Sequence, residues 1–171
     1  RHFSEIHCHF LFHHFGQKLK KKRKMSVNTE KQFRYDIAYL KMAYEWANLS
    51  YCQRKKVGAI IVKNRMIISD GYNGTPSGFE NNCEDEEGNT KWHVLHAEAN
   101  AILKCATSTQ SAEGATLYIT LSPCKDCSKL ILQAGIKRIV YIQQYKDSSG
   151  LEFLEKAGII IQQISEEELY N

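Results

Sequence analysis

Residues 116–143 read TLYITLSPCKDCSKLILQAGIKRIVYIQ, and this stretch decides the fold. Its two ends, 116–120 and 138–143, are rich in β-branched and aromatic side chains, which predicts a strand at each end. Between them, apolar residues recur every three or four positions, which predicts a helix that begins near Pro123 and stops at Gly135. Proline fits the first turn of a helix because its missing N–H has no partner there. The stretch therefore predicts a strand, a helix and a second strand in succession.

The rest of the chain continues this alternation. An apolar spacing of three and four residues predicts a long amphipathic helix over residues 30–50. Two β-branched runs, 57–62 and 66–69, predict a hairpin that turns at Asn64 and Arg65. Further along, we expect a long loop over 70–92, a helix that opens at His96, a short helix over 151–157 and a strand over 159–164. This order predicts an α/β domain with three layers, α/β/α, around a five-stranded mixed sheet.

Two short motifs place three metal ligands and a carboxylate at the starts of helices. Cys124 and Cys127 are three residues apart, so both sulfurs can face one ion, and His96 opens the preceding helix. Zn²⁺ takes thiolates and imidazole, and three protein ligands leave the fourth corner of a tetrahedral site open for water. Glu98 lies about 200° around the helix from His96. It can therefore reach that water and move its proton, first as general base and then as general acid.

The pattern predicts a catalytic zinc site with His96, Cys124 and Cys127 as ligands and Glu98 as the catalytic residue. A structural zinc site is one alternative, although such sites usually have four protein ligands from cysteine and histidine. Unpaired core cysteines are the other alternative, because a single C-x-x-C is ambiguous.

The charge of the chain is unevenly distributed. Residues 1–24 hold seven Lys/Arg and one acid, whereas 25–171 hold sixteen Lys/Arg and eighteen acids. A mildly acidic domain argues against a nucleic-acid substrate, which needs a basic face. The sequence has no run of eighteen apolar residues, so we expect no membrane span. Two of the six cysteines belong to the metal motif and no signal peptide is evident, so we expect a cytoplasmic protein.

Residues 1–24 form a leader of unusual composition, with five of the seven histidines followed by a basic run over 18–24. A nucleic-acid or membrane-binding arm is one interpretation. A signal peptide fits badly, because the charge follows the apolar stretch and histidines interrupt it. We expect instead that Met25 is the true start, and that the leader is disordered or non-native and dispensable.

Four motifs together resemble the deoxycytidylate (dCMP) deaminase family of the cytidine deaminase-like superfamily. They are His96-Ala97-Glu98, the P-C-x-x-C run over 123–127, the G-Y-N-G-x-P-x-G run over 71–78, and Ala134-Gly135-Ile136. The resemblance covers about residues 30–165 and implies a cytidine deaminase-like fold, with a zinc-dependent deaminase domain over 25–171. It also implies hydrolysis of dCMP to dUMP and ammonia for thymidylate synthesis, by a hydrolase that acts on the C–N bond of a cyclic amidine.

The resemblance further implies partners and ligands. It implies a homo-oligomer, often a hexamer, that dCTP with Mg²⁺ activates and dTTP inhibits. Residues Gly71, Tyr72, Asn73 and Gly74 would form an allosteric nucleotide-binding loop, and Asn73 would contact the substrate sugar. Glycines let backbone N–H groups approach phosphate. An ordinary glycine-rich turn is the alternative.

Other substrate and metal contacts are expected nearby. Ala97, within the zinc motif, and Ser122, through its backbone carbonyl, would line the substrate pocket. Of the basic residues before the first strand, we favour Arg54 as the partner of a 5′-phosphate, with a solvated surface charge as the alternative. In phage and some bacterial members, residues near Cys52, Cys83 and His93 hold a second, structural zinc. Free thiols and a loop histidine are the alternative here, because no fourth ligand is identified.

Two other classes of function remain open at this stage. One is a different deaminase, of the tRNA-editing, riboflavin-pathway or free cytidine type. The other is a non-catalytic, zinc-stabilised interaction module, for which Glu98 would be expendable.

Overall fold

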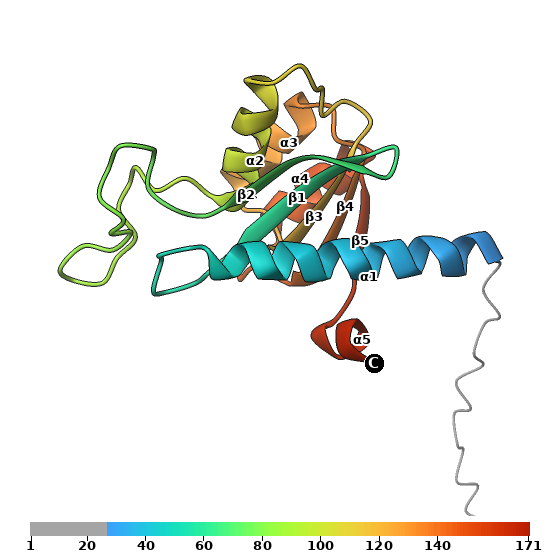
Figure 1. Cartoon of the computed structure of the whole chain (residues 1–171), viewed down its shortest axis with the longest axis horizontal. Coiled ribbons are helices and arrows are strands. Elements are labelled where there is room, and N and C mark those ends of the chain that lie inside the picture. The colour runs from blue at the N-terminus through green and yellow to red at the C-terminus, as the bar shows by residue number, and fades with distance from the viewer. Residues whose placement is uncertain (1–26) are drawn as a thin grey trace, which may run out of the picture.

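A five-stranded sheet separates two layers of helices in the computed structural model, which describes residues 27–171 (Figure 1). The strands are β1 (Gly58–Lys63), β2 (Met66–Tyr72), β3 (Thr116–Leu121), β4 (Arg138–Gln143) and β5 (Ile160–Gln163), in the order β2-β1-β3-β4-β5. The helices are α1 (Val27–Asn48), α2 (Ala97–Ala106), α3 (Lys125–Gln133), α4 (Ser149–Lys156) and α5 (Glu166–Tyr170). The predicted three-layer α/β fold with a mixed sheet is confirmed.

Strand direction brings distant parts of the chain to one edge of the sheet. β1 is antiparallel to both β2 and β3, whereas β3, β4 and β5 are parallel. The carboxyl ends of β2, β3 and β4 therefore lie at the same edge, together with the beginning of β1. In layered α/β proteins this edge is where ligands bind.

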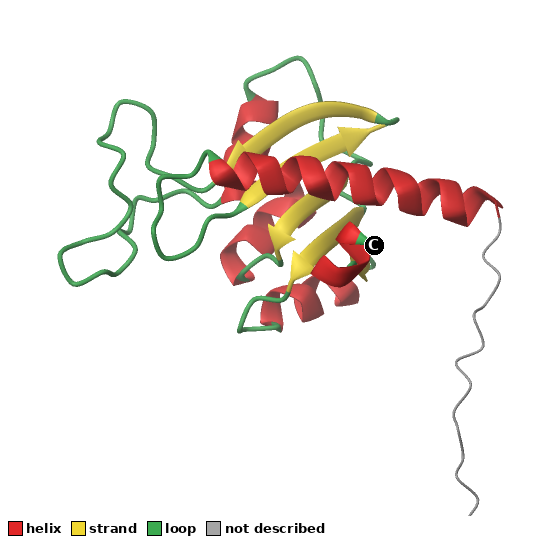
Figure 2. Cartoon of the chain, turned by 60° about the horizontal axis from the view of Figure 1, so that its bottom comes forward, coloured by secondary structure: helices red, strands yellow, loops and turns green. Residues whose placement is uncertain are grey.

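The two faces of the sheet bury separate apolar clusters. Figure 2 shows α1 and α5 on one side of the sheet, where Leu40 and Ala43 pack on Ile60 and Tyr118. The other side is covered by α2, α3 and α4 and holds the larger cluster, which includes Ala97. No helix within residues 27–171 is both long and apolar enough to cross a membrane.

Several predicted boundaries need correction. β2 extends to Tyr72, so the predicted loop over 70–92 begins inside the sheet. α3 starts at Lys125 with Cys124 as its N-cap, so Pro123 precedes the helix instead of opening it. The predicted turn is confirmed, because Asn64 and Arg65 both have positive φ, 51° and 64°, as a two-residue hairpin turn requires.

The last helix was not predicted. Ser165 and Glu168 form a capping box at the start of α5, and Leu169 is buried against the α1 face. The box pattern S-x-x-E was a usable signal, but a five-residue helix is too short for apolar periodicity to reveal. The predicted leader, residues 1–24, lies outside the described residues.

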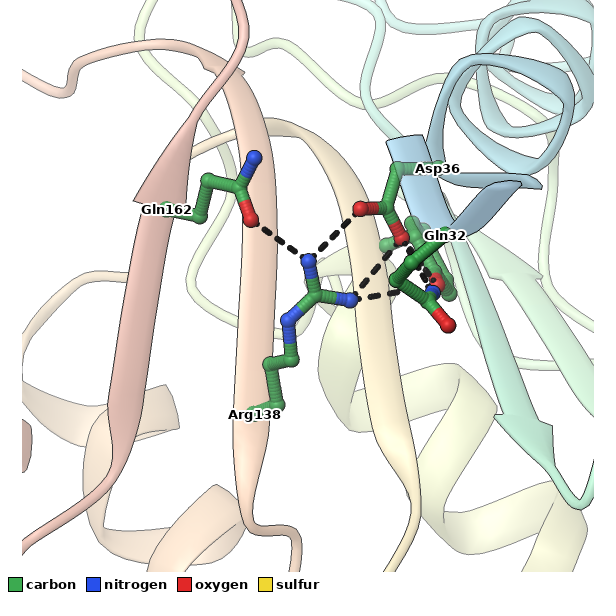
Figure 3. Close-up of polar contacts among 5 residues, drawn as sticks. Gln32, Asp36, Arg138 and Gln162 are labelled. Atoms are coloured by element: carbon green, nitrogen blue, oxygen red, sulfur yellow. Dashed lines mark hydrogen bonds and ion pairs between the residues drawn. The ribbon is translucent and has the colours of Figure 1, made fainter. Parts of the chain in front are cut away.

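A polar cluster ties α1 to the sheet on the face away from α2 (Figure 3). Arg138 on β4 donates from Nη1 and Nη2 to the two carboxylate oxygens of Asp36, at 2.8 and 2.7 Å. The hydroxyl of Tyr118 and the amide of Gln32 also donate to Asp36, and Gln162 accepts from Arg138. Burial raises the pKa of Asp36, but the hydrogen bonds from Arg138, Tyr118 and Gln32 outweigh it and hold the pKa below its usual value. The pair is therefore charged at neutral pH.

Removing the cation from this cluster should destabilise the fold. Side-chain exposure is 2% for Asp36 and 17% for Arg138, so Arg138→Met leaves a buried carboxylate without its counter-ion. We expect a loss of about 3 kcal/mol in the free energy of unfolding, measured by urea denaturation. Lys129→Met, which breaks the exposed pair with Asp126, is the control and should change the urea midpoint little. Equal midpoints for the two variants would contradict this account.

Candidate functional site

The three predicted metal ligands meet where α2 and α3 begin. His96 is the N-cap of α2, and Cys124 is the N-cap of α3. The sulfurs of Cys124 and Cys127 each lie 3.5 Å from Nδ1 of His96. The three ligand atoms all lie within 4.8 Å of one another, and they form the one such cluster of histidine, cysteine and acidic groups found over residues 27–171.

These distances fit a tetrahedral zinc ion. With Zn–S near 2.3 Å and Zn–N near 2.0 Å, tetrahedral geometry separates sulfur and nitrogen ligands by about 3.5 Å. Two sulfurs and an imidazole nitrogen are also the donor set that Zn²⁺ prefers in proteins. Gly150 supports the geometry, because a Cβ there would collide with the backbone of Pro123 and Cys124. α4 thus packs directly on the turn that carries the first sulfur.

The three ligand side chains lie close enough to shift one another's pKa. A hydrogen bond with Cys127 lowers the pKa of Cys124 to about 4, and the His96 ring acts in the same direction. The hydrogen bond with Cys124 raises the pKa of Cys127, and it also raises the pKa of His96. Cys124 is therefore a thiolate at neutral pH, and the positive end of the α3 dipole favours that charge. Binding of a zinc ion would also displace the proton of Cys127, because zinc binds cysteine as the thiolate.

Glu98 lies beside the ligands in the first turn of α2. Its side chain is buried, at 4% exposure, and it lines the same cavity as His96 and Cys124. Burial raises the pKa of Glu98, whereas its own backbone N–H, the neighbouring His96 and the Cys127 thiol favour the charged form. A buried carboxyl that is not needed as a ligand is suited to proton transfer.

The cavity beside the ligands gathers the predicted substrate residues. It has a volume of about 240 Å³. Arg54, Asn73, Ala97 and Ser122 all line it, although they come from four different segments. The strand directions explain this, because Arg54 precedes β1, Asn73 follows β2 and Ser122 follows β3.

Asn73 bonds mainly to the protein. Its Oδ1 accepts from the N–H of Val57 at 2.8 Å, and its Nδ2 donates to the carbonyl of Lys55 at 2.8 Å. Its backbone N–H donates to the Val57 carbonyl, and its carbonyl accepts from Ser50. Each group of a side-chain amide can make one further bond, so a contact with a sugar hydroxyl remains compatible with this role. Asn73 therefore builds the wall of the cavity.

The nucleotide-loop residues divide between two cavities. Asn73 faces the cavity at the metal ligands, whereas Gly71, Tyr72 and Gly74 line a second one of about 650 Å³. This second cavity lies between the 71–79 segment and α2 and is also lined by Phe79 and Lys104. The four residues predicted to act together thus face different spaces.

The residues predicted to hold a second zinc are arranged differently. Cys52 and Cys83 come together, but their sulfurs form a disulfide. His93 instead contacts the rings of Phe79 and Trp92, each with a centroid distance of 5.4 Å. The structure therefore does not assemble the set of Cys52, Cys83 and His93, since two thiolates are needed for such a ligand set. The disulfide was not predicted.

Two further side chains shape the cavity in ways that the sequence did not predict. Glu84 lines it, and is buried at 9% exposure, although it belongs to an acid-rich loop from which sequence alone could not single it out. Ser122 contributes its hydroxyl, which accepts from the N–H of Tyr145 at 2.8 Å and holds that residue at the cavity wall. The role expected for Ser122 was a backbone contact.

Comparison with known proteins agrees with this geometry. The deoxycytidylate deaminase of Enterobacteria phage T4 is 37% identical over 163 residues, covering 70% of this chain and 84% of the relative. The crystal structure of dCMP deaminase from the cyanophage S-TIM5, in complex with dCMP and dUMP, gives a TM-score of 0.74 at 44% identity. That match covers 82% of this chain and 99% of the S-TIM5 chain.

A more distant structure shares the same architecture. The diaminohydroxyphosphoribosylaminopyrimidine deaminase/reductase of Thermotoga maritima is 26% identical with a TM-score of 0.62, and the match covers 77% of this chain but 37% of that one. A family model for the cytidine and deoxycytidylate deaminase zinc-binding region matches residues 34–143, which include all three metal ligands and Glu98. This chain therefore belongs to the cytidine and deoxycytidylate deaminase family.

Proposed function

We propose that this chain catalyses the hydrolytic deamination of dCMP to dUMP and ammonia, and so supplies dUMP for thymidylate synthesis. The observation that carries the proposal is the convergence of His96, Cys124 and Cys127 beside the buried Glu98, in a cavity that also reaches the exposed Arg54. A three-ligand zinc site with a spare carboxyl supports hydrolysis, and a cation at the same cavity supports a phosphorylated substrate.

The chemistry follows from the groups at the cavity. A zinc ion held by His96, Cys124 and Cys127 would supply a Lewis acid that lowers the pKa of a bound water to about 7. Glu98 takes a proton from the attacking water and delivers it to the cytosine ring. A C4–O bond forms, the C4–N bond breaks, and the amino group takes the second proton of the attacking water and leaves as ammonia. Burial raises the pKa of Glu98, and a raised pKa makes its carboxylate a stronger base toward the proton of the attacking water.

The direct test measures ammonia release by the zinc-loaded full chain. The panel contains dCMP, CMP, deoxycytidine, a riboflavin-pathway pyrimidine and a tRNA stem-loop. We expect the highest kcat/KM for dCMP, with deoxycytidine lower because it lacks the phosphate. Best turnover of the stem-loop or of the riboflavin-pathway pyrimidine would replace this proposal with another deaminase activity.

The proposal extends to assembly and regulation. We propose a cytoplasmic homo-oligomer, with a hexamer favoured, that dCTP with Mg²⁺ activates and dTTP inhibits. The second cavity supports an effector site, because Tyr72 and Phe79 offer rings for a base and Lys104 offers a cation for phosphate. Adding dCTP with Mg²⁺ should raise turnover at low dCMP, and dTTP should lower it. Light scattering after size exclusion reports the oligomer, and insensitivity to both nucleotides would refute the regulation.

For the metal, we propose one catalytic zinc per chain. The disulfide between Cys52 and Cys83 supports this stoichiometry. A metal analysis that gives two zinc ions per chain would instead favour the second site predicted from Cys52, Cys83 and His93.

A further inference from the structure

The turn that carries Arg54 is held in place by a small hairpin. Residues 83–91 fold back on themselves, with a bridge between Glu84 and Thr90 and a hydrogen bond from Lys91 N–H to the carbonyl of Cys83. This hairpin contacts the 52–54 turn at successive points. Cys83 is bonded to Cys52, and the Thr90 hydroxyl accepts from Arg54 Nη1 at 3.4 Å.

Glu84 makes the contact that sets the backbone of the turn. Its Oε1 accepts from the N–H of Gln53 at 3.0 Å and from the N–H of Arg54 at 3.2 Å. The disulfide fixes where the chain lies at Cys52 but not how the next two peptide planes are oriented. One carboxylate oxygen that accepts from both N–H groups fixes those planes. Glu84 therefore controls the direction in which the Arg54 side chain leaves the backbone.

Arg54 is available for an anion. It is exposed, it lines the cavity at the metal ligands, and no ion pair within residues 27–171 includes it. Its neighbour Lys55 instead donates to Gln143. A guanidinium has several fixed donors that match phosphate oxygens, so its direction matters more than that of a lysine.

We propose that Glu84 is a positioning residue for phosphate recognition, which orients Arg54 toward the 5′-phosphate of the substrate. This inference rests on the proposed function, since it concerns a nucleoside monophosphate in the same cavity. Glu84 acts through Arg54 and does not contact the phosphate itself, because its negatively charged carboxylate and the negatively charged phosphate would repel each other.

Binding of the product separates this inference from catalysis. Calorimetry measures the Kd of dUMP and of deoxyuridine, which differ by the phosphate alone. Glu84→Ala should raise the Kd of dUMP about tenfold or more and the Kd of deoxyuridine less than about twofold. Glu84→Gln should recover most of the loss, because its amide oxygen can accept from the same two N–H groups. Arg54→Ala should raise the Kd of dUMP by about 10–100-fold. The R54A/E84A double variant should raise it no further, because Glu84 acts only through Arg54.

A control variant and a second substitution at Glu84 complete the test. Glu86→Ala changes an exposed acid of the same hairpin and should leave both Kd values unchanged. If Glu84→Ala does not fold, Glu84→Asp withdraws the acceptor by one methylene and should show the same selectivity. Three results would each overturn the inference. The losses in dUMP affinity caused by R54A and E84A could multiply in the double variant, or Glu84→Ala could weaken deoxyuridine binding as much as dUMP binding. The third is that Glu84→Gln binds dUMP no better than Glu84→Ala. Absence of dCMP turnover by the wild type, with dUMP binding intact, would count against the proposed function alone.

Discussion

Replacing Glu98 with glutamine is expected to lower kcat for deamination by about 10²–10⁴-fold, the range that general acid–base catalysis supplies. Glutamine keeps the volume of this buried side chain, so the packing of α2 is preserved. It cannot accept the proton of the attacking water or return it to the ring. Ammonia release under saturating substrate reports kcat, and zinc content per chain should stay at the wild-type value.

A matched variant separates this effect from a general loss of charge. Glu113→Gln removes an exposed carboxylate away from the cavity and should retain wild-type kcat. Survival of deamination in Glu98→Gln would show that Glu98 is not the residue that transfers the proton. Glu98→Ala should also lose activity, although the space it leaves in a buried position adds a cost in stability.

The second large effect is expected from the metal ligands. Cys127→Ser replaces a sulfur ligand with a hydroxyl, which is a poor zinc ligand. We expect zinc affinity to fall by more than about 100-fold, since even indirect support of a ligand contributes 10–100-fold. Zinc at a thousandfold excess over Kd stabilises the wild type by about 4 kcal/mol. The variant should therefore lose the zinc-dependent rise in Tm together with its deaminase activity.

Cys105 offers the control for this variant. It is a buried cysteine on α2, and its sulfur lies near the carbonyl of Gln110 instead of at the metal ligands. Cys105→Ser keeps a donor for that carbonyl and should retain zinc and activity. If Cys127→Ser binds zinc as tightly as Cys105→Ser, the three-ligand account is wrong.

The catalytic core could be predicted because its metal ligands and Glu98 lie within two short sequence motifs. The spacing of Cys124 and Cys127 restricts both sulfurs to one helix start, and His96 marks the start of another. Alternating strands and helices then bring the two helix starts to one edge of the sheet. The five strands were predicted for the same reason, since their β-branched runs are bounded by turns.

The other features of the site could not be predicted, because they depend on contacts between segments that are distant in the sequence. Glu84 resembles its acidic neighbours in sequence, and only the docking of the 83–91 hairpin on the 52–54 turn gives it a role. The disulfide between Cys52 and Cys83 joins residues 31 positions apart, a pairing that spacing does not specify. The resemblance placed Asn73 at the cavity, but the backbone groups that its amide bonds, at Lys55 and Val57, belong to the segment before β1.

The most direct measurement is X-ray absorption at the zinc edge of the zinc-loaded chain. The account predicts a four-coordinate ion with two sulfur ligands, one imidazole nitrogen and one oxygen from solvent. In Cys105→Ser the spectrum should be unchanged. A first shell made of four protein ligands, or one that lacks either sulfur, would contradict the account.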